Sequence, residues 1–135
     1  MTTYDFKDGK GPVPAHQHSN GGGWVADTAT VSATAYVGPD ARVSGYALVY
    51  GYARVYDNAL VYGYARVSDY AQVFGNAEVS GNAEVYGNAV VYGNAQVSGN
   101  AQVFDNALVY GYARVYDNAL VSDNARVSGY DQKSS

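Results

Sequence analysis

The sequence has no cysteine, and its 135 residues include one methionine, one tryptophan and three prolines. Without cysteine the chain forms no disulfide and offers no thiolate for catalysis or metal binding. Its 8 Lys and Arg against 12 Asp and Glu give a net charge of -4. Proteins that bind nucleic acid need clustered basic side chains, so we predict no nucleic-acid partner. No apolar run is long enough to span a membrane, and residues 1–7 lack the apolar stretch of a signal peptide. We therefore predict no membrane partner and a cytoplasmic location.

A strict six-residue repeat takes up most of the chain. Eighteen valines stand at every sixth position from Val25 to Val127, and an alanine stands four places after each valine but the last, without insertion or deletion. Side chains alternate along an extended segment, so an alanine and the valine two places later point to the same side. The residues directly before and after each valine point to the other side. Each hexad therefore predicts a short strand with a small apolar inner face and a variable outer face.

The residues between the strands have the composition of tight turns. The second position after valine is Gly or Asp in 16 of 18 units, and the third is Asn in nine units and Tyr in six. Asparagine tolerates the left-handed region better than other non-glycine residues, so we predict that conformation at the third position. The six tyrosines would then be strained by about 1 kcal/mol each. They would also stack in pairs 18 residues apart, such as Tyr46 with Tyr64.

A period of six with regular turns is the signature of a parallel β-helix. The order of an aliphatic residue, Gly or Asp two places on, Asn and then Ala, as in residues 79–84, resembles the hexapeptide repeat of left-handed parallel β-helices. The resemblance implies a left-handed triangular solenoid with three hexads in each coil. The 17 complete hexads of residues 25–126 then give about six coils. We predict an all-β, single-domain left-handed parallel β-helix over residues 25–130, with a short N-terminal cap (1–24) and a polar C-terminal tail (131–135).

The cap and the tail depart from the repeat. Residues 21–23 are three glycines that predict a turn, and Trp24, directly before the first repeat valine, predicts an apolar lid over the core. Asp131 stands where the next alanine is due. A carboxylate in a Val and Ala core would lose its hydration, so we expect the coil to stop there. Protected ends of this kind favour a closed oligomer over end-to-end growth. The cap and residues 37–43 also resemble the opening of small hexapeptide proteins encoded by phages and bacteria.

The hexapeptide family that the repeat resembles includes acyltransferases and γ-type carbonic anhydrases. For the first class the resemblance requires a catalytic histidine, often near a loop that interrupts the coils, and for the second it requires three histidines on the coils. The repeat has no interruption, and no histidine follows His18. We therefore predict that the protein is not an enzyme.

His16 and His18 form the one group that predicts a metal site. In an extended segment the two imidazoles lie on the same side, and neutral imidazole suits Fe, Ni, Zn or Cu. One chain supplies only two ligands, whereas three chains around a three-fold axis would supply six. The alternative is that both histidines are solvent-exposed in a flexible cap. No cofactor is predicted apart from this transition metal.

One outward column of the solenoid is aromatic. Every eighteenth residue from Gly38 onward reads Gly38, Tyr56, Phe74, Tyr92, Tyr110 and Ser128. Four successive rings should thus stack at about 4.8 Å, with Val90 and Leu108 in the neighbouring outward column. A continuous apolar strip on a surface usually marks an interface. The predicted interface residues are Tyr56, Phe74, Tyr92, Tyr110, Val90 and Leu108. The alternative is that the stacked rings only stabilise the sheet.

These features favour a non-enzymatic structural or interaction solenoid that assembles with itself through its aromatic side. The resemblance to the hexapeptide family implies a homotrimer, the usual state in that family. The resemblance to phage-encoded hexapeptide proteins implies a virion-associated location as part of a phage particle. The alternative function is a ligand-binding module in which tyrosine ladders hold a sugar, a nucleotide or a similar small molecule. Hexapeptide acyl transfer is the third alternative.

Overall fold

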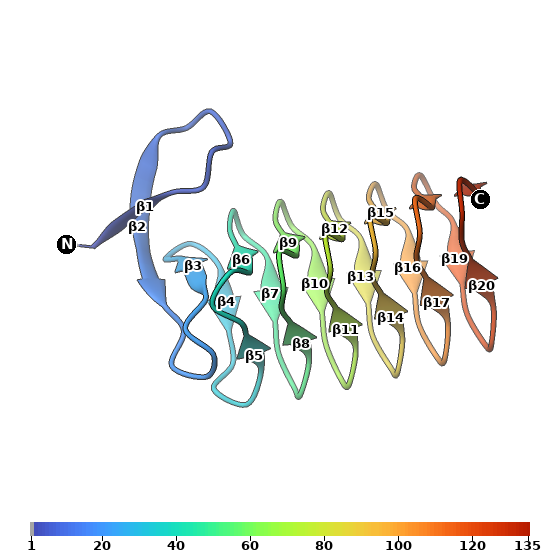
Figure 1. The fold of residues 1–135 in the computed structure, drawn as a ribbon, viewed down its shortest axis with the longest axis horizontal. Helices are drawn as coiled ribbons and strands as arrows, with labels where there is room; N and C mark the ends of the chain where they lie inside the picture. The colour runs from blue at the N-terminus through green and yellow to red at the C-terminus, as the bar shows by residue number, and fades with distance from the viewer. Residues whose placement is uncertain (1) are drawn as a thin grey trace.

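The structure, a computed structural model, describes residues 2–135, which contain 21 β-strands and no helix. Figure 1 shows a β-hairpin at the N-terminal end, followed by a row of stacked coils. The predicted all-β fold class is confirmed. None of the described residues belongs to a helix that could cross a membrane.

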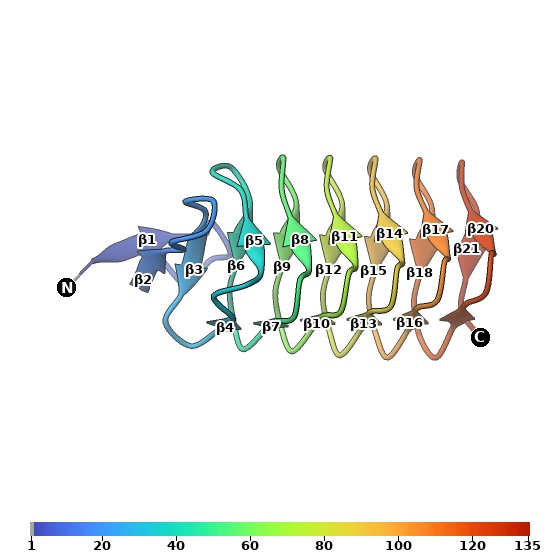
Figure 2. The ribbon, with the colours of Figure 1, turned by 90° about the horizontal axis from the view of Figure 1, so that it is seen from below.

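Three strands of at least three residues open the chain: β1 (Thr3–Asp5), β2 (Pro12–Gln17) and β3 (Trp24–Ala26). Two-residue strands follow, one in each hexad, and they line the three sides of the solenoid (Figures 1 and 2). The first sheet continues from β1, β2 and β3 through β6 (Arg42–Val43), β9 (Leu60–Val61), β12 (Glu78–Val79), β15 (Gln96–Val97), β18 (Arg114–Val115) and β21 (Gln132–Lys133). The second sheet consists of β4 (Thr30–Val31), β7 (Leu48–Val49), β10 (Arg66–Val67), β13 (Glu84–Val85), β16 (Gln102–Val103) and β19 (Leu120–Val121). The third sheet consists of β5 (Tyr36–Val37), β8 (Arg54–Val55), β11 (Gln72–Val73), β14 (Val90–Val91), β17 (Leu108–Val109) and β20 (Arg126–Val127).

From β3 onward, each strand pairs in parallel with the strands 18 residues away. Val67, for example, lies opposite Val49 on one side and Val85 on the other. This offset confirms three hexads in each coil, and the three sheets form a triangular parallel β-solenoid of about six turns. The left hand of the coil stays a prediction of the resemblance.

The repeat valines and alanines form one continuous core. From Ala35 to Ala119 each of them is 0% exposed. Backbone amides of outward residues donate to carbonyls one coil further on, as from Leu48 N to Ala65 O (2.9 Å) and from Tyr50 N to Val67 O (3.0 Å). Burial of apolar area stabilises a fold by about 25 cal/mol per Å². Because every coil adds the same ring of side chains, stability should grow with the number of coils.

The left-handed residue of each corner is the second after valine, and not the third as predicted. From Gly45 to Gly129 these second positions have φ between 54° and 70°, whereas no described tyrosine has a positive φ. The third residue instead donates its amide to the next coil, as from Tyr64 N to Gly81 O (2.8 Å). This interaction holds it in an ordinary conformation, so the predicted strain in the corner tyrosines is wrong.

The N-terminal cap is a β-hairpin that continues the first sheet. β1 pairs antiparallel with β2, and β2 pairs antiparallel with β3, so that Ala15 lies opposite Ala26. The loop after β2 lies against β5, where Gly23 N donates to Val37 O and Val37 N donates to Asn20 O, both at 3.0 Å. The cap thus pairs with the free strand edge of the first coil on two of its three sides.

Trp24 is not a lid over the core. It lies in β3 opposite Arg42, and its ring stacks on Tyr4 at 4.7 Å between centroids. The residue before a repeat valine faces outward, which is why this prediction failed. The Arg42 guanidinium lies 5.4 Å from the Tyr4 ring centroid and completes a small cluster outside the first sheet.

The coil also does not stop at Asp131. The strand β21 follows it and pairs in parallel with β18, with Lys133 opposite Val115, and Asp131 O accepts a hydrogen bond from Arg114 N (2.9 Å). Asp131 and Lys133 are both exposed. The carboxylate therefore keeps its hydration, and the expected desolvation cost does not arise.

Candidate functional site

The predicted aromatic column forms a continuous ladder on the outer side of the third sheet. The centroid distances are 4.8 Å for Tyr56–Phe74, 5.1 Å for Phe74–Tyr92 and 5.0 Å for Tyr92–Tyr110. Neighbouring rings are within 7° of parallel. The 18-residue register causes this stack, because it places each residue after valine directly over its equivalent in the next coil.

Val90 and Leu108 lie beside the ladder at the level of its last two rings. Val90 pairs with Leu108 across β14 and β17, and both side chains are half-buried. The structure thus brings all six predicted interface residues together on one side. Whether another molecule covers them stays a prediction.

Hydroxyl groups of the outward tyrosines reach diagonally to the next coil. Tyr56 donates to Gln72 Oε1 (3.2 Å), and Tyr62 donates to Glu78 Oε1 (3.1 Å). Burial raises the pKa of Tyr56, the Asp57 carboxylate raises it further, and the Arg54 guanidinium lowers it. These phenols therefore stay neutral hydrogen-bond donors well above neutral pH.

Shorter aromatic stacks occur elsewhere on the solenoid. On the second sheet Tyr86 and Phe104 stack at 5.1 Å. The corner pairs expected from the sequence also stack: Tyr46–Tyr64 at 5.3 Å, Tyr52–Tyr70 at 5.5 Å and Tyr112–Tyr130 at 5.1 Å. No stack on the other two sheets has four rings, which distinguishes the third sheet among residues 2–135.

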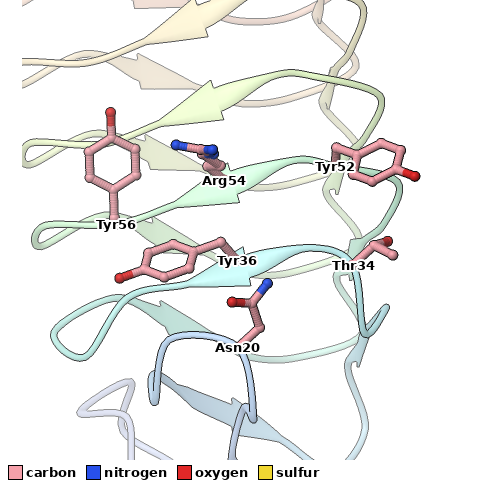
Figure 3. A pocket seen from close by; sticks show the side chains of 6 residues that line it. All are labelled: Asn20, Thr34, Tyr36, Tyr52, Arg54 and Tyr56. Carbon is pink, nitrogen blue, oxygen red and sulfur yellow. The ribbon is translucent and has the colours of Figure 1, made fainter.

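A groove that we did not predict adjoins the N-terminal end of the ladder. Its volume is about 520 Å³, and it is lined by Asn20, Thr34, Tyr36, Tyr52, Arg54 and Tyr56. Figure 3 shows Arg54 between Tyr56 on one side and Tyr52 on the other, with Tyr36 and Asn20 toward the N-terminus. The repeat alone could place Tyr36, Arg54 and Tyr56 together. It could not place Asn20, because that residue comes from the cap loop.

The metal hypothesis for His16 and His18 gains no third ligand within the part of the chain that the structure describes. His16 is exposed, and its Nδ1 lies 2.7 Å from Asp27 Oδ1. His18 is buried, and its Nε2 bonds to Ala35 O at 2.8 Å. Residues 2–135 contain no group of three or more His, Cys, Asp or Glu that could hold a metal. A site shared between chains stays a prediction.

A family model supports the repeat. The model described as the YdcK beta solenoid repeat matches residues 53–69, 83–99, 95–111, 101–115 and 113–129. Each match begins at a repeat alanine, and the starting alanines belong to all three sides of the solenoid. No curated protein and no solved structure matches the chain. Together with the 18-residue register, these matches show that the chain is built of β-solenoid repeats, which match the YdcK-type repeat over residues 53–69 and 83–129.

Proposed function

We propose that the protein is a non-enzymatic interaction solenoid that assembles with itself through its third sheet. The observation that carries this proposal is the four-ring ladder from Tyr56 to Tyr110 with Val90 and Leu108 beside it. Aromatic and aliphatic side chains in one continuous strip expose apolar surface to water, which is unfavourable until a partner covers that surface. The rings are evenly spaced because the backbone beneath them is regular, so a second copy would present an equally regular strip of the same side chains.

The proposed assembly is a closed homotrimer, as the resemblance implies, since symmetric closed oligomers dominate among soluble assemblies. A place in a phage particle is part of the same proposal and comes from the resemblance alone. A non-enzymatic role is supported by the position of the histidines. His18 is buried against Ala35 O, and His16 is bonded to Asp27 in the cap. Neither lies on the coils, where the resemblance places the histidines of the carbonic anhydrases, or on a loop that interrupts the coils, where it places the histidine of the acyltransferases.

A double substitution in the middle of the ladder tests the assembly. Phe74→Asp with Tyr92→Asp puts two carboxylates at the centre of the strip, where burial against a partner would strip them of water. We expect light scattering to show monomers, with the β-sheet circular dichroism spectrum retained because both side chains face outward.

The matched control is Tyr86→Asp with Phe104→Asp, which makes the same change to the stacked pair on the second sheet. This control should keep the native mass. If the ladder variant also keeps the native mass, the third sheet is not the interface. If both variants become monomeric, the effect of the charges is not specific to the ladder, and the proposal fails.

The groove beside Arg54 favours a second function, that of a ligand-binding module. Three tyrosines, one arginine, one asparagine and one threonine line it. Small-molecule sites combine aromatic walls with a few polar groups that orient the ligand, and this lining has that composition. Calorimetric titration of the protein with sugars and nucleotides tests this function. The ligand-binding function requires that at least one of these two classes binds.

A further inference from the structure

The Tyr56 ring ends the ladder with one face uncovered by an aromatic side chain. Phe74 stacks on one face at 4.8 Å, and the corresponding position on the other side is Gly38. A Cβ at residue 38 would lie 3.0 Å from Tyr56 Cβ and 3.4 Å from Tyr36 Cε2. Gly38 does not have a positive φ, so its backbone conformation does not require glycine. The missing side chain instead opens the space between the Tyr36 and Tyr56 side chains.

Arg54 supplies an uncompensated positive charge beside that space. The only ion pair within residues 2–135 joins His16 and Asp27, so no carboxylate lies within salt-bridge distance of the Arg54 guanidinium. The side chain is exposed and lies in β8, between the tyrosines on either side of it (Figure 3). A guanidinium offers five N–H donors in a planar fork that matches a carboxylate. Arg54 is thus free to bind an anion from outside the chain.

The remaining lining groups suit a ligand that carries hydroxyls. Asn20 Nδ2 donates to Ala35 O (3.1 Å), and Thr34 Oγ1 donates to Gly51 O, so both side chains are held in place. The tyrosine hydroxyls that bond to other groups of residues 2–135 are those of Tyr56, Tyr62, Tyr86 and Tyr116. The hydroxyls of Tyr36 and Tyr52 are therefore available as donors and acceptors for a ligand.

From these features we infer that the groove binds a carboxylated pyranose, the uronic-acid unit of an acidic glycan. The apolar face of the sugar ring would lie against Tyr36 and Tyr56, and its carboxylate would accept hydrogen bonds from the Arg54 guanidinium. Its hydroxyls would form hydrogen bonds with the free hydroxyls of Tyr36 and Tyr52. This inference rests on the second function proposed above. It names the class of ligand for that site.

The charge of the site favours a carboxylate over a phosphate. The lining contains one cationic side chain, which balances the single charge of a uronic acid, whereas a phosphate monoester carries about two charges at neutral pH. The chain as a whole has a net charge of -4, and Asp57 lies close enough to Tyr56 to raise its pKa. Both effects oppose a more highly charged ligand. Tyr52 and Arg54 are exposed, so the groove is open along its outer side and can take a sugar within a longer chain.

Calorimetric titration with a glucuronic-acid-containing tetrasaccharide tests the inference on the intact protein. The tetrasaccharide contains one glucuronic acid, and the comparison ligands are the same tetrasaccharide with that carboxyl group reduced to an alcohol, and uridine monophosphate. We expect the acidic tetrasaccharide to bind at least tenfold more tightly than either. Arg54→Gln should lower the affinity for the acidic tetrasaccharide at least tenfold, because a hydrogen-bonded ion pair is lost.

Arg126→Gln is the matched control, because Arg126 is also exposed and occupies the same outward column of the third sheet, four coils away. It should leave the affinity within twofold. Equal binding of the reduced tetrasaccharide, or tighter binding of the nucleotide, overturns the inference and leaves the ligand-binding function standing. If none of the three ligands binds, both are wrong. The mass by light scattering, measured on the same samples, reports separately on self-assembly.

Discussion

The corner residues show how a single position decides the local backbone. Five aspartates have a left-handed φ: Asp57, Asp69, Asp105, Asp117 and Asp123. Three of them accept a hydrogen bond from the corner amide one coil on, as Asp69 Oδ2 does from Gly87 N (3.0 Å). A residue with a Cβ is disfavoured in this conformation. Aspartate is accepted here because its carboxylate accepts a hydrogen bond from that amide, which offsets the steric cost. Glycine has no side chain to accept this bond.

A substitution series at Asp69 tests this account. Asp69→Ala keeps a Cβ in the left-handed conformation and loses the acceptor, so we expect a loss of about 1–2 kcal/mol in the free energy of unfolding. Asp69→Gly loses the acceptor but removes the steric penalty, and Asp69→Asn keeps both an acceptor and some tolerance of the conformation. These two should lie within about 0.5 kcal/mol of the wild type. Urea denaturation gives the order, and an alanine variant as stable as the glycine variant would contradict it.

The strand is the element for which the sequence is most informative. Alternation within each hexad makes inner and outer residues differ completely although they are neighbours. In β14, Val91 is 0% exposed in the core, while Val90 is half-buried on the outer side. Two valines in one strand therefore provide a matched comparison of the two environments.

We predict that Val91→Thr costs about 1–3 kcal/mol, because it places a hydroxyl of nearly the same shape in a core without polar partners. Val90→Thr should change the free energy of unfolding of the single subunit by less than about 0.5 kcal/mol, since its hydroxyl faces outward and reaches water where no partner covers the strip. Urea denaturation of both variants measures the difference. Equal effects would show that the inner face is less dry than its zero exposure indicates.

Strand positions, coil length and the aromatic ladder could be predicted because each depends only on the period of the sequence. The left-handed residue of the corner, however, lies one position earlier than the sequence predicts. Composition shows that Gly or Asp precedes Asn or Tyr, but only the inter-coil bond of the third amide, such as Tyr64 N to Gly81 O, shows which of the two turns left-handed. The cap had no repeat to guide a prediction, so the pairing of β2 with β3 and the outward position of Trp24 came only from the structure. The groove was missed for the same reason, because Asn20 reaches it from the cap.

At the scale of the whole molecule, the core and the surface follow different rules. The core repeats every six residues, whereas each outer column repeats every 18 residues. A deletion of one hexad therefore preserves the core but moves every later hexad to the neighbouring side. A deletion of three hexads preserves both. The two deletions separate what stability needs from what the proposed assembly needs.

Deletion of residues 80–97 removes one coil and joins Val79 to Ser98 with the repeat intact. The ladder closes up, so that Tyr110 follows Phe74 on the third sheet. Deletion of residues 80–85 removes only one hexad, but it brings Ser98 to the position after Phe74 and carries Tyr92 and Tyr110 to the second sheet. Both deletions leave the groove around Arg54 unchanged, because it lies in earlier coils.

We predict that both variants fold with a β-sheet circular dichroism spectrum, since every junction keeps valine and alanine in phase. The 18-residue deletion variant should be less stable than the wild type, because its core has one coil of valines and alanines fewer. It should nevertheless keep the native subunit number in light scattering. The six-residue deletion removes less of the chain but divides the strip, and it should give monomers. If the six-residue deletion keeps the native subunit number, assembly does not depend on the continuity of the ladder, whatever the stability of the two variants.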